Sequence, residues 1–105
     1  MGRETDIQRN VIRRLIRHEK VGWCNRNNTG KALINGRMVE FGLGKGSADI
    51  IGQLKDGRFL AVEVKTETGL VTKEQLLFIN RVIRHNGVAF IARHPDDVNR
   101  ALDGL

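Results

Sequence analysis

Apolar side chains in the first twenty residues recur with the period of an α-helix. Five of them are separated mainly by three or four positions between Glu4 and about Glu19: Ile7, Val11, Ile12, Leu15 and Ile16. This spacing predicts a helix. A second face carries basic side chains, namely Arg9, Arg13, Arg17 and Lys20. That face is either a solvated surface or one that contacts phosphates, and the sequence leaves both interpretations open.

Short apolar runs separated by turn signals follow, and they predict β-strands. The expected strands cover residues 21–24, 32–34, 38–41, 48–54 and 58–65. Asn35-Gly36 predicts a tight hairpin turn between the second and the third of them. In the last strand both the even positions, such as Leu60 and Val62, and the odd positions Phe59 and Ala61 are apolar. A strand that is apolar on both faces is expected at the centre of a sheet.

Two more helices and one more strand are expected in the last third of the chain. The first of these helices opens at Thr72 and is expected to end at Gly87. Its apolar positions are Leu76, Leu77, Ile79, Val82 and Ile83. A strand over residues 88–92 follows, and Pro95 is expected at the first position of the last helix. The mixture of elements predicts an α/β fold, in a single domain over residues 1–105.

The charge of the chain favours a polyanionic partner. Lysine and arginine number 18 against 12 aspartate and glutamate residues, which leaves a net charge of +6. Nucleic acid is the leading interpretation, although an unspecific basic surface has the same charge.

Cysteine usage and hydropathy indicate an intracellular protein without a membrane partner. A single cysteine, Cys24, excludes an internal disulfide, and we expect it to be a small buried side chain. No apolar segment near the N-terminus is long enough for a signal peptide or a membrane helix. The Met1-Gly2 start does not fit N-myristoylation, because Asp6 stands where that pattern has serine or threonine.

Two charged residues end the predicted central strand. Glu63 and Lys65 are two positions apart, so their side chains lie on the same side of the strand. Charges at such a place require a partner, because burial of an unpaired charge is costly. The alternative is that both side chains extend past the core and are solvated.

The length of one hairpin loop decides whether Asp49 can meet Glu63. A two-residue loop would pair Asp49 with Val64, and the two carboxylates would then point to opposite faces of the sheet. A three-residue loop over residues 55–57, with Gly57 in the left-handed conformation, would set Asp49 directly opposite Glu63. We predict the three-residue loop, partly because it alone brings the two carboxylates together for a shared metal ion.

Two adjacent carboxylates at this place favour a metal site. They repel each other unless one is protonated or a cation lies between them. Oxygen ligands with open positions suit Mg²⁺ or Mn²⁺, and such an ion polarises a phosphate and lowers the pKa of a water molecule. Lys65 would orient or deprotonate that water, or stabilise charge on the phosphate.

Four elements of the sequence resemble the VRR-Nuc branch of the PD-(D/E)XK nuclease superfamily. They are Glu4 with Gln8, the segment Gly44 to Asp49, Glu63-Val64-Lys65, and Gln75. They occur in the order of that family and span nearly the whole chain. Ala48 departs from the pattern, since many relatives carry proline there, and this change affects backbone stiffness rather than chemistry.

The resemblance implies a restriction-endonuclease-like fold, in which helices flank a mixed central sheet. The site residues that it implies are Asp49, Glu63 and the Val64 main-chain carbonyl as metal ligands, Lys65 as a catalytic residue, and Glu4 and Gln75 as further parts of the site. Stand-alone members are similar to archaeal Holliday junction resolvases, which implies a homodimer that acts on branched DNA.

Helix capping is an alternative role for part of this set. Thr5-x-x-Gln8 and Thr72-x-x-Gln75 both fit capping boxes, in which the glutamine satisfies a backbone donor at the start of its own helix. The sequence leaves capping and catalysis open for Gln75.

Two polar segments are expected to contact nucleic acid. The residues are Arg26 and Lys31 in a basic segment rich in asparagine, and Lys45 and Ser47 in a segment rich in glycine. Ordinary surface or connecting loops are the alternative. No nucleotide cofactor is expected, because Gly42, Gly44 and Gly46 precede a strand instead of opening a helix.

Taken together, these patterns predict a Mg²⁺- or Mn²⁺-dependent endonuclease for DNA. A nucleic-acid-binding module with a merely structural acidic cluster is the main alternative. A basic assembly protein without metal dependence is a third interpretation.

Overall fold

The computed structural model describes residues 3–105, which contain three helices and six strands. The helices are α1 (Arg3–Arg17), α2 (Lys73–Arg84) and α3 (Asp96–Leu102). The strands are β1 (Val21–Arg26), β2 (Gly30–Ile34), β3 (Arg37–Phe41), β4 (Ile50–Leu54), β5 (Phe59–Val64) and β6 (Val88–Ala92). The Met1-Gly2 start considered above lies outside the described residues.

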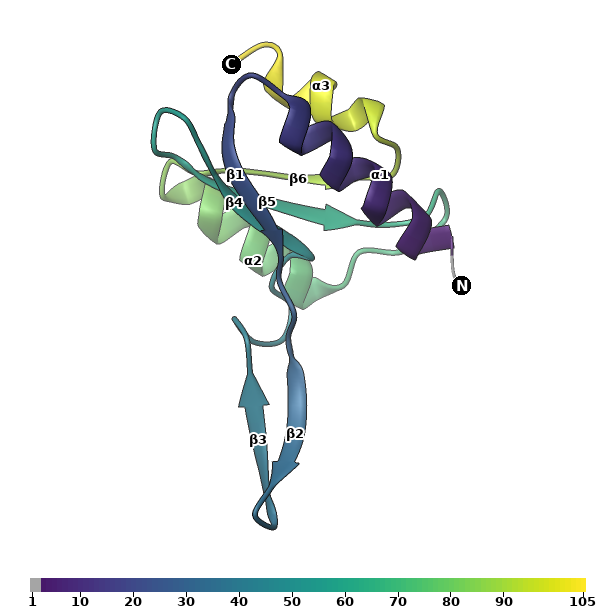
Figure 1. Ribbon diagram of the computed structural model, residues 1–105, viewed down its shortest axis with the longest axis vertical. Coiled ribbons are helices and arrows are strands. Elements are labelled where there is room, and N and C mark those ends of the chain that lie inside the picture. The colour runs from purple at the N-terminus through teal and green to yellow at the C-terminus, as the bar shows by residue number, and fades with distance from the viewer. Residues whose placement is uncertain (1–2) are drawn as a thin grey trace.

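Four strands form a mixed sheet in the order β1-β4-β5-β6. The pairs β1–β4 and β4–β5 are antiparallel, whereas β5 and β6 are parallel. Helices α1 and α3 cover one face of this sheet and α2 covers the other (Figure 1). The predicted fold class, an α/β fold with a mixed central sheet flanked by helices, is therefore confirmed. None of the described helices has the length and hydrophobicity needed to cross a membrane.

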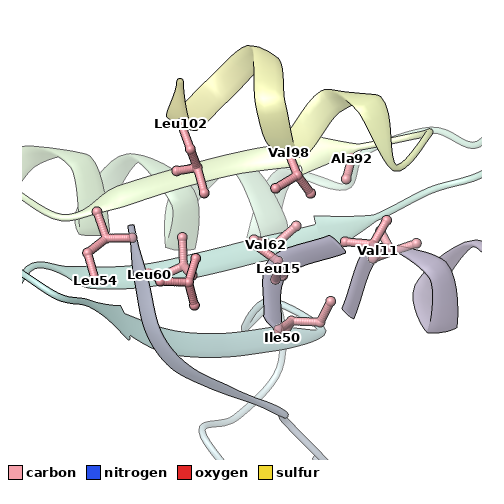
Figure 2. Packing of buried hydrophobic residues seen from close by; sticks show 11 residues of the cluster. Val11, Leu15, Ile50, Leu54, Leu60, Val62, Ala92, Val98 and Leu102 are labelled. Carbon is pink, nitrogen blue, oxygen red and sulfur yellow. The ribbon is translucent and has the colours of Figure 1, made fainter. Parts of the chain in front are cut away.

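Strand β5 lies at the centre of the fold and separates two apolar clusters. Its even positions, including Leu60 and Val62, pack with residues of α1 and α3 in the larger cluster, part of which Figure 2 shows. Its odd position Ala61 packs with Val82 of α2 in the smaller cluster. Residues 60–64 are all buried, as expected for a strand that is apolar on both faces. Because side chains alternate along a strand, Glu63 lies on the α2 side.

Strands β2 and β3 form a separate antiparallel hairpin that projects away from the rest of the molecule (Figure 1). Its two-residue turn consists of Asn35 and Gly36, whose φ angles of 51° and 77° fit the predicted tight turn. The longest dimension of the molecule is 48 Å, against 31 Å and 24 Å for the other two.

Two predictions about helix ends are wrong. Thr5 lies inside α1, which already includes Arg3, so Thr5 does not cap this helix. After α2 the residue with left-handed backbone is Asn86, with a φ of 71°, because asparagine tolerates this conformation. Gly87 follows it and donates its N–H to the Val82 carbonyl at 2.8 Å, in a Schellman pattern. A Cβ atom at Gly87 would lie 2.5 Å from Val82 Cγ1, which explains the glycine.

Three predictions about the first half of the chain also change. Arg26 and Lys31 lie in strands instead of a loop. Arg26 ends β1 and pairs with Ile50 of β4, and Lys31 is the second residue of β2 and pairs with Glu40 of β3. Cys24 is half-buried instead of buried, since β1 is an edge strand of the sheet. Strand β4 begins at Ile50, two residues later than predicted, so Asp49 directly precedes it.

Candidate active site

The β4–β5 hairpin sets Asp49 opposite Glu63. Ile50 pairs with Val62, so the residues next to this pair, Asp49 and Glu63, face each other in the same register. The connecting loop has three residues, since the Leu54 N–H donates to the Arg58 carbonyl at 2.9 Å. Gly57 has a φ of 98°, the left-handed conformation that this loop requires. The predicted three-residue loop is confirmed.

Three carboxylates converge near the start of β4 and the end of β5. Oxygen atoms of Glu4, Asp49 and Glu63 all lie within 4.8 Å of one another. Glu4 comes from the first turn of α1 and is exposed, Asp49 is half-buried, and Glu63 is only 2% exposed. We call these residues the acidic triad. Within residues 3–105 no other group of three histidine, cysteine or acidic side chains gathers in this way.

The main chain of β5 helps to fix Asp49. The Val64 N–H donates a hydrogen bond of 2.9 Å to Asp49 Oδ2. This hydrogen bond holds the Asp49 side chain against β5, the strand that carries Glu63. Val64 thus contacts Asp49 through its N–H, whereas the role that the resemblance implies for its carbonyl, as a metal ligand, stays a prediction.

Burial makes the ionised form of Glu63 unfavourable. The pKa of this carboxyl is raised to about 8, chiefly because burial removes solvent and also because Asp49 is nearby, while Lys65 acts to lower it. Glu63 Oε1 is buried and has no hydrogen-bond partner in the described part of the chain. A buried acceptor without a partner is costly. The oxygen donors of the triad and this unpaired atom together fit a hard divalent cation.

Gln75 joins the start of α2 to the buried carboxylate. Its side-chain carbonyl accepts a hydrogen bond from the Thr72 N–H at 2.9 Å, and the Thr72 hydroxyl accepts one from the Gln75 N–H at 3.1 Å. Its side-chain amide nitrogen also donates to Glu63 Oε2 at 2.8 Å. Capping and contact with the site are therefore not alternatives, because the two ends of the amide serve one role each.

Lys65 lies on the same side of the site. Its Nζ atom is 3.8 Å from Glu63 Oε2, and its side chain is 15% exposed. This largely buried ammonium group favours the ionised form of the Glu63 carboxyl and so acts to lower its pKa.

Asn27, which the sequence reasoning missed, holds the segment that delivers Asp49. Its side-chain amide donates to the Ala48 carbonyl and to Ser47 Oγ, both at 2.8 Å. Its own N–H donates to the Asp49 carbonyl at 2.8 Å. Two of these hydrogen bonds hold the main-chain carbonyls of Ala48 and Asp49, and the third holds the side chain of Ser47.

Arg93 is a second missed residue, and it fixes the segment that follows Lys65. Its Nη1 atom donates to the carbonyls of Thr66, Glu67 and Gly69 at 2.7, 3.3 and 2.8 Å. Gly69 lies only a few residues before the capping box of α2. Arg93 therefore supports the connection between Lys65 and Gln75.

The four residues predicted to contact nucleic acid lie in different surroundings. Arg26 is exposed at the end of β1, where it pairs with Ile50 next to Asp49. Lys31 and Lys45 line a common cavity of about 400 Å³, and Lys31 is 3.8 Å from Glu40. Ser47 donates to the Gly44 carbonyl at 2.7 Å and accepts from Asn27. Its hydroxyl group therefore makes hydrogen bonds within the protein, to the residues around the segment before Asp49.

Comparison with known proteins supplies a family for this site. The family model of the VRR-NUC domain matches residues 2–94 of the 105-residue chain. No curated protein and no solved structure matches the chain. The match includes the whole acidic triad, Lys65, Gln75 and both missed residues. The chain therefore belongs to the VRR-NUC family of nuclease domains.

Proposed function

We propose that this protein is a Mg²⁺- or Mn²⁺-dependent endodeoxyribonuclease that hydrolyses phosphodiester bonds in branched DNA, such as Holliday junctions. The observation that carries the proposal is the approach of Glu4, Asp49 and Glu63 to within 4.8 Å of one another. A bound cation would relieve the repulsion within this set of oxygen donors and stabilise the ionised form of Glu63. A nuclease of this family has a use for that cation, since its substrate is itself an anion.

Each residue of the site has a separate task in this proposal. Asp49 and Glu63, with the Val64 carbonyl, hold the ion, and Glu4 completes the set from α1. When bound, the ion supplies Lewis acidity toward the phosphate and a lower pKa for an attacking water molecule. Lys65 orients that water or neutralises charge on the phosphoryl oxygens. Gln75 keeps Glu63 in the orientation that ligation requires, through its hydrogen bond of 2.8 Å.

The surface around the site favours DNA as the substrate. The net charge of +6 attracts the phosphate backbone, and Arg26 lies next to the strand end that carries Asp49. Lys31 and Lys45 share one cavity and add two cations on the side of the hairpin. A chain of 11.8 kDa spans only part of a junction, so a two-fold dimer with two sites matches a two-fold substrate.

The substrate and the metal are tested together with Asp49→Asn. The matched control is Asp6→Asn, which makes the same chemical change at an exposed carboxylate of α1 outside the triad. Labelled junction, flap and duplex DNA are incubated with Mg²⁺, with Mn²⁺ and with a chelator. We expect wild type and Asp6→Asn to cut the junction fastest and only with metal, and Asp49→Asn to bind it without cutting.

Other outcomes of this panel separate the alternatives. Binding without cleavage by the wild type under every metal condition would indicate a nucleic-acid-binding module. Cleavage that persists in Asp49→Asn would remove Asp49 from the mechanism. Equal cleavage of duplex and junction would keep the nuclease and remove the preference for branched DNA.

A further inference from the structure

A cavity of about 540 Å³ lies at the start of α1. Its walls come from three segments that are far apart in the sequence: the first turns of α1, the residues after Lys65, and the connection from β6 to α3. These segments meet at one edge of the molecule (Figure 1). The charged and polar side chains that line the cavity are Arg3, Asn10, Glu67, Arg93, His94 and Asp97.

The cavity adjoins the candidate active site through two of its walls. Arg3 directly precedes Glu4 of the acidic triad in α1, and Glu67 follows Lys65 by two residues. Successive Cα atoms are about 3.8 Å apart, so a molecule in the cavity lies close to the triad. A DNA strand whose scissile phosphate is at the triad can therefore place a neighbouring phosphate in this cavity.

Arg93 gives the wall of the cavity a positive charge without a carboxylate partner. Its Nη1 atom donates to three main-chain carbonyls, and within residues 3–105 its guanidinium group forms no salt bridge. The carbonyls fix the position of the group but carry no net charge. Because Arg93 is half-buried, solvent compensates its charge only in part. An anion in the cavity would supply the missing counter-charge.

Three more side chains bring hydrogen-bond donors to the cavity. Arg3 is exposed and also forms no salt bridge in the described part of the chain, and Asn10 offers its side-chain amide. His94 Nδ1 accepts the Asp96 N–H at 3.0 Å, so the neutral ring carries its proton on Nε2, as a donor. Guanidinium groups with additional N–H donors suit the oxygen atoms of a phosphate group.

The two carboxylates of the cavity do not cancel its cations. Asp97 Oδ2 accepts the main-chain N–H groups of Arg93 and His94 at 2.8 and 3.2 Å, and Asp97 Oδ1 pairs with Arg100. Glu67 is exposed, so water and salt screen its charge. The cavity therefore favours an anion over a cation.

We propose that this cavity binds a phosphate group of the DNA backbone next to the scissile phosphate. Arg3 and Arg93 are its charged contacts, and His94 adds a neutral donor. The proposal rests on the DNA substrate of the proposed function and adds a site that positions the strand. The cavity holds the strand on the α1 side of the triad, whereas Lys31 and Lys45 lie at the base of the hairpin.

Arg3→Gln tests this site, because Arg3 is exposed at the start of its helix, whereas Arg93 also supports the connection before α2. Arg13→Gln removes the same charge from an exposed position of α1 outside the cavity and is the matched control. Both changes are made in the Asp49→Asn protein, which we expect to bind junction DNA without cutting it. Affinity is measured over a range of salt concentrations, with normal DNA and with one uncharged methylphosphonate placed in turn at each position around the branch point.

We expect Arg3→Gln to lower the affinity for normal DNA by about tenfold. The slope of log affinity against log salt should fall by about 0.9, the value for one lost phosphate contact. Arg13→Gln should keep the affinity and the slope of the Asp49→Asn protein. A methylphosphonate at one position should weaken binding by the Asp49→Asn protein and have no effect on Arg3→Gln, and wild type should cut next to that position.

Equal losses in Arg3→Gln and Arg13→Gln would indicate unspecific attraction and overturn the proposal. A methylphosphonate effect that persists in Arg3→Gln at every position would do the same. If calorimetry shows that inorganic phosphate binds through Arg3 while no methylphosphonate changes the DNA affinity, the cavity takes a free anion and the assignment to the DNA backbone is wrong. A wild type that cuts no DNA contradicts the proposed function, whereas the coupling of Arg3 to one phosphate is still read from binding.

Discussion

The side chain of Gln75 contacts Glu63 and Thr72 at the same time, through opposite ends of one amide group. The nitrogen donates to Glu63 Oε2 at 2.8 Å and the oxygen accepts from the Thr72 N–H at 2.9 Å. Gln75 therefore links the first turn of α2 directly to the buried Glu63 carboxylate.

Substitution at these two positions separates the two roles of Gln75. Thr72→Ala removes the cap without touching Glu63, whereas Gln75→Ala removes both the cap partner and the donor to Glu63. We expect each variant to lose about 1 kcal/mol in the free energy of unfolding. Only Gln75→Ala should also weaken Mn²⁺ binding and DNA cleavage. Denaturant unfolding and calorimetry measure the two effects, and equal metal affinity in both variants would limit Gln75 to capping.

The stability of the metal-free protein should fall as pH rises. The pKa of Glu63 is about 8 in the folded chain, against an ordinary value of 4.5. Between these values the folded state binds more protons than the unfolded state, so the free energy of unfolding decreases from about pH 4.5 to pH 8. Thermal unfolding in a chelator measures this slope. We expect it to be smaller in Glu63→Gln and unchanged in Glu19→Gln, which removes an exposed carboxylate.

Metal binding should show the complementary pH dependence. A cation binds the ionised form of Glu63, so binding below about pH 8 releases a proton and the apparent affinity rises toward that pH. Calorimetry in two buffers of different ionisation enthalpy measures the number of protons released. Binding that releases no proton at pH 6 would contradict ligation by Glu63.

Removal of the Asn27 amide should displace Asp49 while the three carboxylates of the acidic triad are retained. Asn27→Asp keeps the size of the side chain but loses the donors to Ala48 and Ser47. A buried acceptor left without its donor costs about 1–3 kcal/mol, so we expect lower stability and weaker Mn²⁺ binding. Asn28→Asp adds the same charge at the neighbouring exposed position and serves as the control. Equal metal affinity in both variants would show that Asn27 has no part in placing Asp49.

Lys65 should affect turnover more than metal binding. Lys65→Met keeps much of the aliphatic chain and removes the ammonium group, so we expect the cleavage rate to fall by roughly 10²- to 10⁴-fold. Mn²⁺ binding should persist. Lys55→Met, in the exposed hairpin loop, should cleave at the wild-type rate. Single-turnover cleavage at saturating protein measures the chemical step, and a loss confined to DNA affinity would assign Lys65 to substrate binding.

The sequence predicted the parts of the site that depend on neighbouring strands. Strand alternation places Glu63 and Lys65 on one side, and the loop over residues 55–57 sets the register that brings Asp49 opposite Glu63. Both relationships act within a short stretch of chain and leave a signature in residue spacing. The choice of loop length still required a chemical argument.

The residues that sequence reasoning missed act over longer separations. Asn27 reaches a carbonyl 21 residues away, and Arg93 reaches carbonyls 24 to 27 residues away. Apart from Ser47 Oγ, their partners are main-chain oxygens, which every residue type offers, so the residue types give little sign of the contact. The same limit applies to Asn86, where Gly87 is the more conspicuous helix terminator but the asparagine adopts the left-handed backbone.

The loop over residues 55–57 also makes the protein vulnerable to a change in chain length. It lies on the surface, where an inserted or deleted residue ordinarily has little effect on folding. Here a shift of one position between β4 and β5 would rotate Asp49 to the opposite face of the sheet and separate its carboxylate from that of Glu63. Related chains that keep the chemistry should therefore keep the number of residues in this turn and a glycine at the left-handed position of Gly57, and vary in the rest of its composition.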